Sequence, residues 1–197
     1  MMDRYRFSKR VIDIIISLLV IGILWPIFIL IAISIALTSQ GGVIFKHQRV
    51  GKGSKLFTFY KFRTMSIDTS KYILKPREDD PRIDKVGRFL RKSSLDELPQ
   101  IINVLKGEMS VVGPRPEMPF IVENYTNKER ERLKVKPGIT GLWQLSGKTK
   151  EMIHNNLEYD LNYIKNQSFL LDLKVLFRTF IVFFKMLNIA YKNFWNK

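Results

Sequence analysis

Two adjacent carboxylates, Asp96 and Glu97, lie in the stretch SSLDELPQ (residues 93–100) and are the clearest candidates for chemistry. A carboxylate can attack phosphorus and form an intermediate of the aspartyl-phosphate type. Such a pair can also help to hold Mg²⁺, which proteins bind through one or two carboxylates together with substrate phosphates. The alternative is structural, because the helix dipole favours acidic residues in the first turn of a helix.

Basic residues elsewhere in the sequence favour the chemical interpretation, because phosphoryl transfer needs cations that hold the phosphates. Arg91 precedes the carboxylates, and a cation near a helix start is expected to keep Asp96 ionised. Arg115 lies between two prolines, so its stiff backbone suits a fixed phosphate clamp, although a solvated arginine in a turn is the simpler alternative. Lys61 and Arg63 are further candidates for phosphate contact.

The charge of the chain predicts an anionic partner. Its 197 residues include 33 Lys and Arg against 18 Asp and Glu, which gives a formal net charge of +15. Such a chain is expected to bind nucleic acid, phosphorylated metabolites or an anionic membrane surface. There is no cysteine, so disulfides and a thiol nucleophile are excluded. With only His47 and His154, a histidine-rich metal site or a histidine-based triad is not expected.

An apolar run over residues 14–37 contains no charged residue and as a helix is long enough to span a bilayer. Pro26 lies at its centre, where proline kinks or breaks a helix. Basic residues flank both ends, and the positive-inside rule places both flanks in the cytoplasm. These features favour a re-entrant helix that enters one leaflet and returns. A kinked spanning helix stays the alternative.

The rest of the chain predicts an α/β fold dominated by helices, with a small β-hairpin or sheet. Residues 43–65 read as two strands around a glycine-rich turn, and residues 85–92, 95–106, 126–134 and 150–166 read as helices. Ser94 and Glu97 have the spacing of a capping box. Residues 68–84, 107–119 and 136–148 read as loops. The tail is a long helix with basic residues among bulky apolar ones, which lies on a membrane surface or covers the core.

Several motifs together resemble the bacterial sugar transferase family, in its small, monotopic phosphoglycosyl transferase form and most nearly its bacillosaminyl-phosphate transferase type. The resemblance covers roughly residues 8–180. Its motifs are KRVIDIIIS, VIFKHQRVG, FYKFRTM, LRKSSLDELPQIINVLKGEMSVVGPRPE, KPGITGLWQLSGK and YDLNYIKNQSFLLDLKVL, together with the apolar run that Pro26 interrupts.

The resemblance implies an enzyme that moves a sugar 1-phosphate from a UDP-sugar to undecaprenyl phosphate and releases UMP, with Mg²⁺ as cofactor. It implies that Asp96 is the nucleophile and that Glu97 completes the dyad, either by helping to hold Mg²⁺ or by assisting proton transfer from the polyprenyl phosphate. It implies that Arg91 and Arg115 contact phosphate, with Lys61 and Arg63 beside them, and that Gly138 and Gln144 lie near the nucleotide-sugar. For the sugar, the resemblance suggests an N-acetylated 6-deoxy sugar, with galactose and glucose as the alternatives, and a homo-oligomer stays open.

The resemblance also implies a location at the inner leaflet of the bacterial cytoplasmic membrane, with the active site facing the cytoplasm. Residues 1–40 then form the membrane anchor, residues 41–167 the catalytic domain and residues 168–197 an interfacial amphipathic helix. The sequence departs from the family in Trp25, where serine is frequent, and in Lys136 and Lys148, where arginine is common.

Two functions without catalysis are alternatives to the enzyme. One is a membrane-anchored module that binds nucleic acid, although no motif of a known nucleic-acid-binding fold is present. The other is an adaptor whose basic face binds anionic lipid. The adaptor reading leaves the Asp96–Glu97 pair and the Pro114–Arg115–Pro116 segment without a function.

Overall fold

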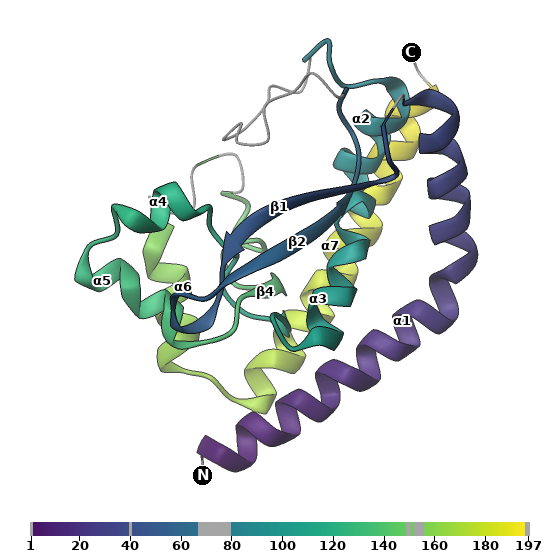
Figure 1. The fold of residues 1–197 in the computed structure, drawn as a ribbon. Helices are drawn as coiled ribbons and strands as arrows, with labels where there is room; N and C mark the ends of the chain where they lie inside the picture. The colour runs from purple at the N-terminus through teal and green to yellow at the C-terminus, as the bar shows by residue number, and fades with distance from the viewer. Residues whose placement is uncertain (1, 40, 67–79, 149–150, 152–155, 196–197) are drawn as a thin grey trace.

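A computed structural model describes the chain except for residues 1, 40, 67–79, 149–150, 152–155 and 196–197 (Figure 1). Helices dominate the described residues, as predicted. The α-helices are α1 (Met2–Thr38), α2 (Lys85–Ser93), α3 (Ile101–Lys106), α4 (Pro119–Glu123), α5 (Asn127–Arg130), α6 (Leu157–Lys165) and α7 (Phe169–Trp195). Three 3₁₀ segments are η1 (Lys52–Ser54), η2 (Leu95–Gln100) and η3 (Glu131–Lys134). The strands are β1 (Ile44–Val50), β2 (Leu56–Phe62), β3 (Ser110–Val112) and β4 (Gly138–Thr140).

The predicted hairpin is confirmed. Strands β1 and β2 pair antiparallel with His47 opposite Phe59 and Phe45 opposite Lys61, and η1 makes the turn. Gly53 has φ of 67° in that turn, a conformation that glycine adopts without a steric penalty. Directly opposite residues point to the same face of an antiparallel pair. One face of the hairpin therefore carries Phe45, His47 and Arg49 together with Phe57, Phe59 and Lys61.

Some of the local predictions are wrong. Residues 107–119 and 136–148 are not loops throughout, because Ser110–Val112 and Gly138–Thr140 pair as the parallel strands β3 and β4. Helix α4 also lies in a stretch for which no helix was predicted. The predicted helix over residues 95–106 divides into η2 and α3. The prediction for residues 68–84 falls largely on residues that the structure does not describe.

The predicted capping box at Ser94 is wrong as well. Ser94 has φ of 59° and ψ of 15°, so it is a left-handed residue that ends α2, and its side chain caps nothing. Glu97, the other half of the expected box, instead accepts hydrogen bonds from Lys61 and Arg115. The turn at Ser94 separates α2 from η2 and aims the acidic residues at the hairpin.

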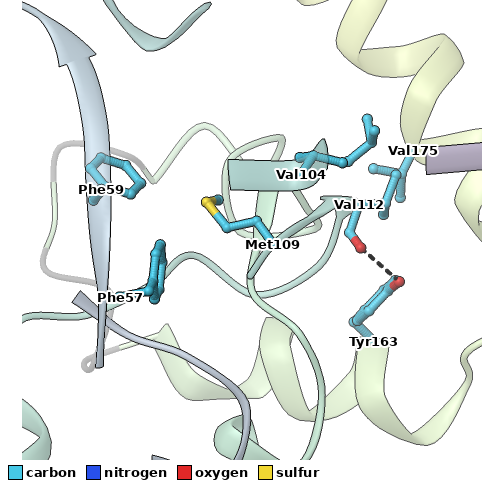
Figure 2. Packing of buried hydrophobic residues seen from close by; sticks show 8 residues of the cluster. Phe57, Phe59, Val104, Met109, Val112, Tyr163 and Val175 are labelled. Carbon is cyan, nitrogen blue, oxygen red and sulfur yellow. Dashed lines mark hydrogen bonds between the residues drawn. The ribbon is translucent and has the colours of Figure 1, made fainter. Parts of the chain in front are cut away.

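The main hydrophobic core joins the hairpin to the helices (Figure 2). Phe57 and Phe59 pack with Met109, with residues of α3 and β3, and with Tyr163 of α6 and Val175 of α7. The Tyr163 hydroxyl donates a hydrogen bond to the Val112 carbonyl at 3.2 Å, which satisfies a polar group inside this core (Figure 2).

Helix α1 continues through Pro26, and Figure 1 shows it bowed, with its ends near α7 and its middle standing away. An interior proline explains such a bend, because it removes a backbone hydrogen bond. Among the described residues, α1 is the one helix that is long and apolar enough to cross a membrane, with a mean hydropathy of 3.0 in its most apolar window.

Both halves of α1 dock on the same domain. In the first half, Asp13 accepts hydrogen bonds at 2.9 Å from the Ser110 hydroxyl and the Val111 amide. Tyr5 and Lys9 donate to Asp172 of α7 at 2.9 and 2.7 Å. In the second half, apolar residues of α1 join a buried cluster with α2, η2 and α7, and the α1 members are Phe28, Ile31 and Ile35.

Candidate active site

The acidic pair sits where the end of α2 meets the hairpin. Asp84 caps the start of α2 by accepting a hydrogen bond from the Gly87 amide. A side chain at Gly87 would lie 2.5 Å from the Thr64 carbonyl, so glycine lets α2 press against the segment after β2. The left-handed turn at Ser94 then directs η2 back along β2. This places Asp96 and Glu97 beside Lys61.

Four of the predicted residues form one contacting cluster. Lys61 Nζ lies 2.6 Å from Glu97 Oε1 and 3.5 Å from Asp96 Oδ2, so it bridges the two carboxylates. Arg115 donates to both oxygens of Glu97, at 2.6 and 3.1 Å. This bidentate geometry is the strong form of an arginine–carboxylate pair. The Asp96 residue is only 8% exposed, so the cluster is largely shielded from water.

The two carboxylates have opposite electrostatic environments. Burial alone would raise the pKa of Glu97, but Arg115 and Lys61 outweigh it and hold that pKa well below its usual range. Burial raises the pKa of Asp96, and Glu97 adds to this, while Lys61, Arg91 and Arg115 act in the other direction. Burial therefore acts against the expectation that the helix start and Arg91 keep Asp96 ionised. Two neighbouring carboxylates whose pKa values are shifted in opposite directions are typical of a site for acid–base chemistry.

Arg115 is held by an unusually well-anchored loop. Each carbonyl of Pro114, Arg115 and Pro116 accepts a hydrogen bond, from the Gly138 amide at 2.8 Å and from two guanidinium groups at 3.0 and 3.3 Å. Those guanidinium groups belong to Arg132 and Arg49. The result is a rigid carrier that fixes the direction of the Arg115 side chain, as the flanking prolines predict.

Arg132 is the central support of this loop. Its Nε lies 2.7 Å from Asp160 Oδ2, its other nitrogens donate to the Tyr125 hydroxyl and the Arg115 carbonyl, and its pair with Asp160 is almost fully buried. Burial raises the pKa of Asp160 to about 6, although Arg132 acts to lower it. Sequence reasoning missed Arg132 and Asp160, because nothing local distinguishes a buried pair 28 residues apart.

The hairpin adds two residues that the sequence analysis did not assign to the site. Arg49 donates to the Pro116 carbonyl, lies 3.8 Å from Glu117, and stacks over the Phe59 ring. His47 is buried beside it, and neither ring nitrogen has a hydrogen-bond partner among the described residues. The alternation of side chains along the strands could have identified both residues, because Arg49 and His47 lie on the same face of the predicted hairpin as Lys61.

The environment of His47 predicts a pH-dependent stability. Burial, with the charges of Arg49, Lys61 and Arg115, lowers the pKa of His47 to about 3. Between about pH 3 and 6.5 the unfolded chain therefore binds a proton that the folded protein does not, so stability is lost as the pH falls. We expect His47→Gln to remove a loss of about 2 kcal/mol between pH 7 and 5.

Chemical denaturation of both proteins in detergent at the two pH values measures this difference. The second histidine, His154, is present in both proteins and cancels. Parallel curves for wild type and variant would contradict the assignment of a neutral His47.

The remaining predicted residues lie around the cluster without touching the dyad. Arg91 lowers the pKa of Asp96 through its charge, and no hydrogen bond engages its side chain among the described residues. Arg63 turns to the Gly42 carbonyl. Gly138 packs its backbone against Gly113, so closely that a side chain would lie 2.1 Å from the Gly113 nitrogen. The amide nitrogen of Gln144 faces the Ile139 carbonyl at 3.5 Å.

No group of three or more histidine, cysteine or acidic residues suited to a metal exists within the part of the chain that the structure describes. The dyad alone can still contribute to a Mg²⁺ site. A carboxylate offers about four acceptor positions, and Glu97 uses three of them for Lys61 and Arg115. One position on Oε2 of Glu97 and the oxygens of Asp96 therefore fit a cation whose other ligands are substrate phosphates.

Comparison with known proteins agrees with these features. The family model for bacterial sugar transferases matches residues 4–186. A UDP-glucose:undecaprenyl-phosphate glucose-1-phosphate transferase of Klebsiella pneumoniae is 44% identical over 180 residues, which are 87% of this chain and 39% of that protein. An undecaprenyl-phosphate galactose phosphotransferase of Salmonella typhimurium is 42% identical over 192 residues, covering 88% of this chain and 40% of that protein.

The exopolysaccharide production protein ExoY of Sinorhizobium fredii is 36% identical over 188 residues, covering 87% of this chain and 83% of that protein. The chain thus spans about two fifths of the length of the first two relatives and most of the third.

Proposed function

The chain belongs to the bacterial sugar transferase family, and from this membership we propose that it transfers a sugar 1-phosphate from a UDP-sugar to undecaprenyl phosphate. UMP is the leaving product. The observation that carries the proposal is the shielded cluster in which Lys61 and Arg115 hold the Asp96–Glu97 pair. Relatives named for glucose 1-phosphate and galactose phosphate transfer to undecaprenyl phosphate support this reaction class.

The reaction proceeds in two displacements at one phosphorus. A carboxylate oxygen of Asp96 attacks the phosphorus that carries the sugar, and the bond from that phosphorus to the bridging oxygen breaks. UMP departs with that electron pair. An oxygen of undecaprenyl phosphate then attacks the same phosphorus, the bond to Asp96 breaks, and the carboxylate is regenerated. Each step needs one substrate in place, so the site never aligns donor and acceptor at once.

The basic residues prepare Asp96 for attack. The protonated form that burial favours cannot act as a nucleophile, and the positive charges of Lys61, Arg91 and Arg115 oppose that effect. Lys61 and Arg115 are occupied by Glu97, whereas the guanidinium group of Arg91 makes no hydrogen bond within the described residues. Arg91 is therefore the cation most available for the donor diphosphate, and Glu97 keeps Lys61 and Arg115 in place beside it.

If Mg²⁺ takes part, the remaining Oε2 position of Glu97 and an oxygen of Asp96 are the protein groups that would hold it. The ion supplies charge neutralisation for the diphosphate when it is bound. The protein's contribution is to present only a small number of carboxylate oxygens, as Mg²⁺ sites completed by substrate phosphates require.

The test is the half reaction without acceptor. Purified protein is incubated with Mg²⁺ and a panel of UDP-sugars, including glucose, galactose and N-acetylated 6-deoxy donors, and its intact mass is measured. We expect a gain of one sugar phosphate with the correct donor, and none with EDTA present. UMP release only after undecaprenyl phosphate is added would keep the enzyme class and remove the covalent intermediate. No UMP with any donor would contradict the function.

The packing of α1 supports a re-entrant anchor facing the cytoplasm. A spanning helix would carry its ends to opposite sides of the bilayer, yet Asp13 and Ile35 both contact the same domain. The bowed middle of the helix exposes Leu19, Ile23 and Trp25. We therefore propose that this middle enters one leaflet of the cytoplasmic membrane and that both ends return to the cytoplasmic side.

Helix α7 supports the same placement. One face packs on the domain through Asp172, Val175 and Ala190. Another face is apolar and exposed, and helical spacing places its members on one side of α7: Phe169, Leu170, Leu173, Phe177, Phe180, Ile181, Phe184, Tyr191 and Trp195. Exposed basic residues border this face, namely Lys174, Arg178, Lys185 and Lys192. Such a helix suits the headgroup layer, with its apolar face turned to the acyl chains.

The cysteine-free sequence allows a direct test of the topology. We expect Ser8→Cys and Thr38→Cys, one at each end of α1 and both exposed, to react with a membrane-impermeant maleimide in inverted vesicles and not in intact spheroplasts. Glu131→Cys on the catalytic domain is the control for the cytoplasmic side. Labelling of Ser8→Cys and Thr38→Cys from opposite sides would establish a spanning helix instead.

A further inference from the structure

A cavity of about 410 Å³ lies where the end of α1 meets the end of β2 and the start of α2. Its lining includes Ile35 and Thr38 of α1, Arg63 just after β2, and Val86 of α2. The dyad and Arg115 do not line it. The volume falls within the range of about 300 to 1,000 Å³ that small-molecule sites occupy.

The cavity lies between the end of the anchor helix and the segment that follows Lys61. Lys61, which bridges Asp96 and Glu97, and Arg63 are two residues apart at the end of β2, and so about 7 Å apart along the chain. On the other side, Ile35 and Thr38 belong to the last turn of the apolar helix, where Leu37 is 81% exposed. A ligand in the cavity therefore contacts the end of the anchor helix on one side and Arg63, two residues beyond Lys61, on the other.

Arg63 is fixed in one orientation. Its Nε donates to the Gly42 carbonyl at 2.7 Å, and its guanidinium lies over the Phe45 ring. A side chain at Gly41 would approach that Nε to 2.7 Å, so the glycine leaves room for the guanidinium. Among the described residues, nothing pairs with its two terminal nitrogens, which leaves them available to an anion.

The other charged residues that line the cavity have partners. Arg82 is held by Asp80 at 2.6 and 2.8 Å, and Asp84 caps the Gly87 amide. The described lining therefore offers one uncommitted cation, Arg63, next to an apolar wall that includes Ile35 and Val86. A phosphate group on an apolar chain has this combination of properties.

We propose that this cavity is the acceptor subsite, in which Arg63 binds the phosphate monoester of a polyprenyl phosphate and Ile35 and Thr38 guide its first apolar units towards the membrane. The inference rests on the proposed function, which needs a lipid phosphate to reach the Asp96 phosphosugar. It separates Arg63 from the donor cations and gives the second displacement its own binding site.

The test measures the two half reactions separately in Arg63→Gln and Thr38→Trp. Trp at position 38 fills the membrane end of the cavity, and Leu37→Trp is the matched control on the adjacent, outward-facing position. We expect the KM for undecaprenyl phosphate to rise at least about tenfold in both lining variants, as loss of a charged hydrogen bond predicts for Arg63. Formation of the donor adduct, measured by intact mass, stays as in wild type, and Leu37→Trp has the wild-type KM.

A second readout does not depend on turnover. Retention of radiolabelled undecaprenyl phosphate by immobilised protein in detergent is measured with phosphatidylglycerol as competitor. Retention that is lost in Arg63→Gln and resists phosphatidylglycerol supports the subsite. An unchanged KM and retention in Arg63→Gln, an equal effect of Leu37→Trp, or displacement by phosphatidylglycerol overturns it. These outcomes differ from a failure of the proposed function, in which the wild-type protein forms neither the adduct nor UMP.

Discussion

Asp96→Asn is expected to abolish the sugar-phosphate adduct and to lower transfer by at least about a thousandfold, because an amide cannot replace a carboxylate nucleophile. The substitution keeps the size of the side chain. Asp96 contacts Lys61 only at 3.5 Å, while Glu97 keeps the closer hydrogen bonds to Lys61 and Arg115, so the surrounding cluster is retained. Intact mass after incubation with the donor, followed by UMP release with undecaprenyl phosphate, measures both effects.

Glu97→Gln is the matched control, since it makes the same chemical change one residue away. It weakens the hold on Lys61 and Arg115 and should slow the reaction, but any adduct that forms stays on Asp96, as peptide mapping can show. An adduct of full amount in Asp96→Asn, or an adduct mapped to Glu97, would show that the nucleophile is misassigned. Persistent UMP release in Asp96→Asn would instead favour direct transfer between the substrates.

The sequence predicted the candidate centre because short-range features marked it. Asp96 and Glu97 are neighbours, Arg115 is enclosed by prolines, and Lys61 lies on a strand with clear alternation. The structure brings these four together. The hairpin and the long helices were likewise predictable, because each has a periodic pattern or an extended apolar run.

The missed features depend on contacts between distant parts of the chain. Strands β3 and β4 are three residues each and exist because Ser110 pairs with Gly138 across the fold. Three residues are too few for a period to show. The same holds for Arg132, whose importance comes from Asp160 and the Arg115 carbonyl. Ser94 misled for a different reason, because the capping pattern cannot distinguish a helix start from a left-handed residue that ends the preceding helix.

The support beneath Arg115 makes Arg132→Met the most destabilising substitution we expect. The change leaves Asp160 buried without its cation and removes the donor to the Arg115 carbonyl. Breaking a buried pair in this way costs about 3 to 5 kcal/mol. The penalty should grow with pH. Burial already raises the pKa of Asp160 to about 6, and without Arg132 the carboxyl holds its proton to higher pH still.

Chemical denaturation of Arg132→Met in detergent at pH 5 and pH 8 measures this effect, and the larger loss is expected at pH 8, where ionising the unpaired Asp160 carboxyl costs folding free energy. Lys134→Met is the matched control. Its pair with Glu131 has the same 2.7 Å separation, but the lysine side chain is 65% exposed, so the expected loss is below about 1 kcal/mol.

Equal losses in the two variants would mean that burial does not set the strength of the Arg132 pair. A loss at pH 5 that matches the loss at pH 8 would mean that Asp160 does not take up the proton. If both expectations hold, the transferase activity that Arg132→Met retains at pH 5 measures how much the function of Arg115 depends on the support that Arg132 gives to the Pro114–Pro116 loop.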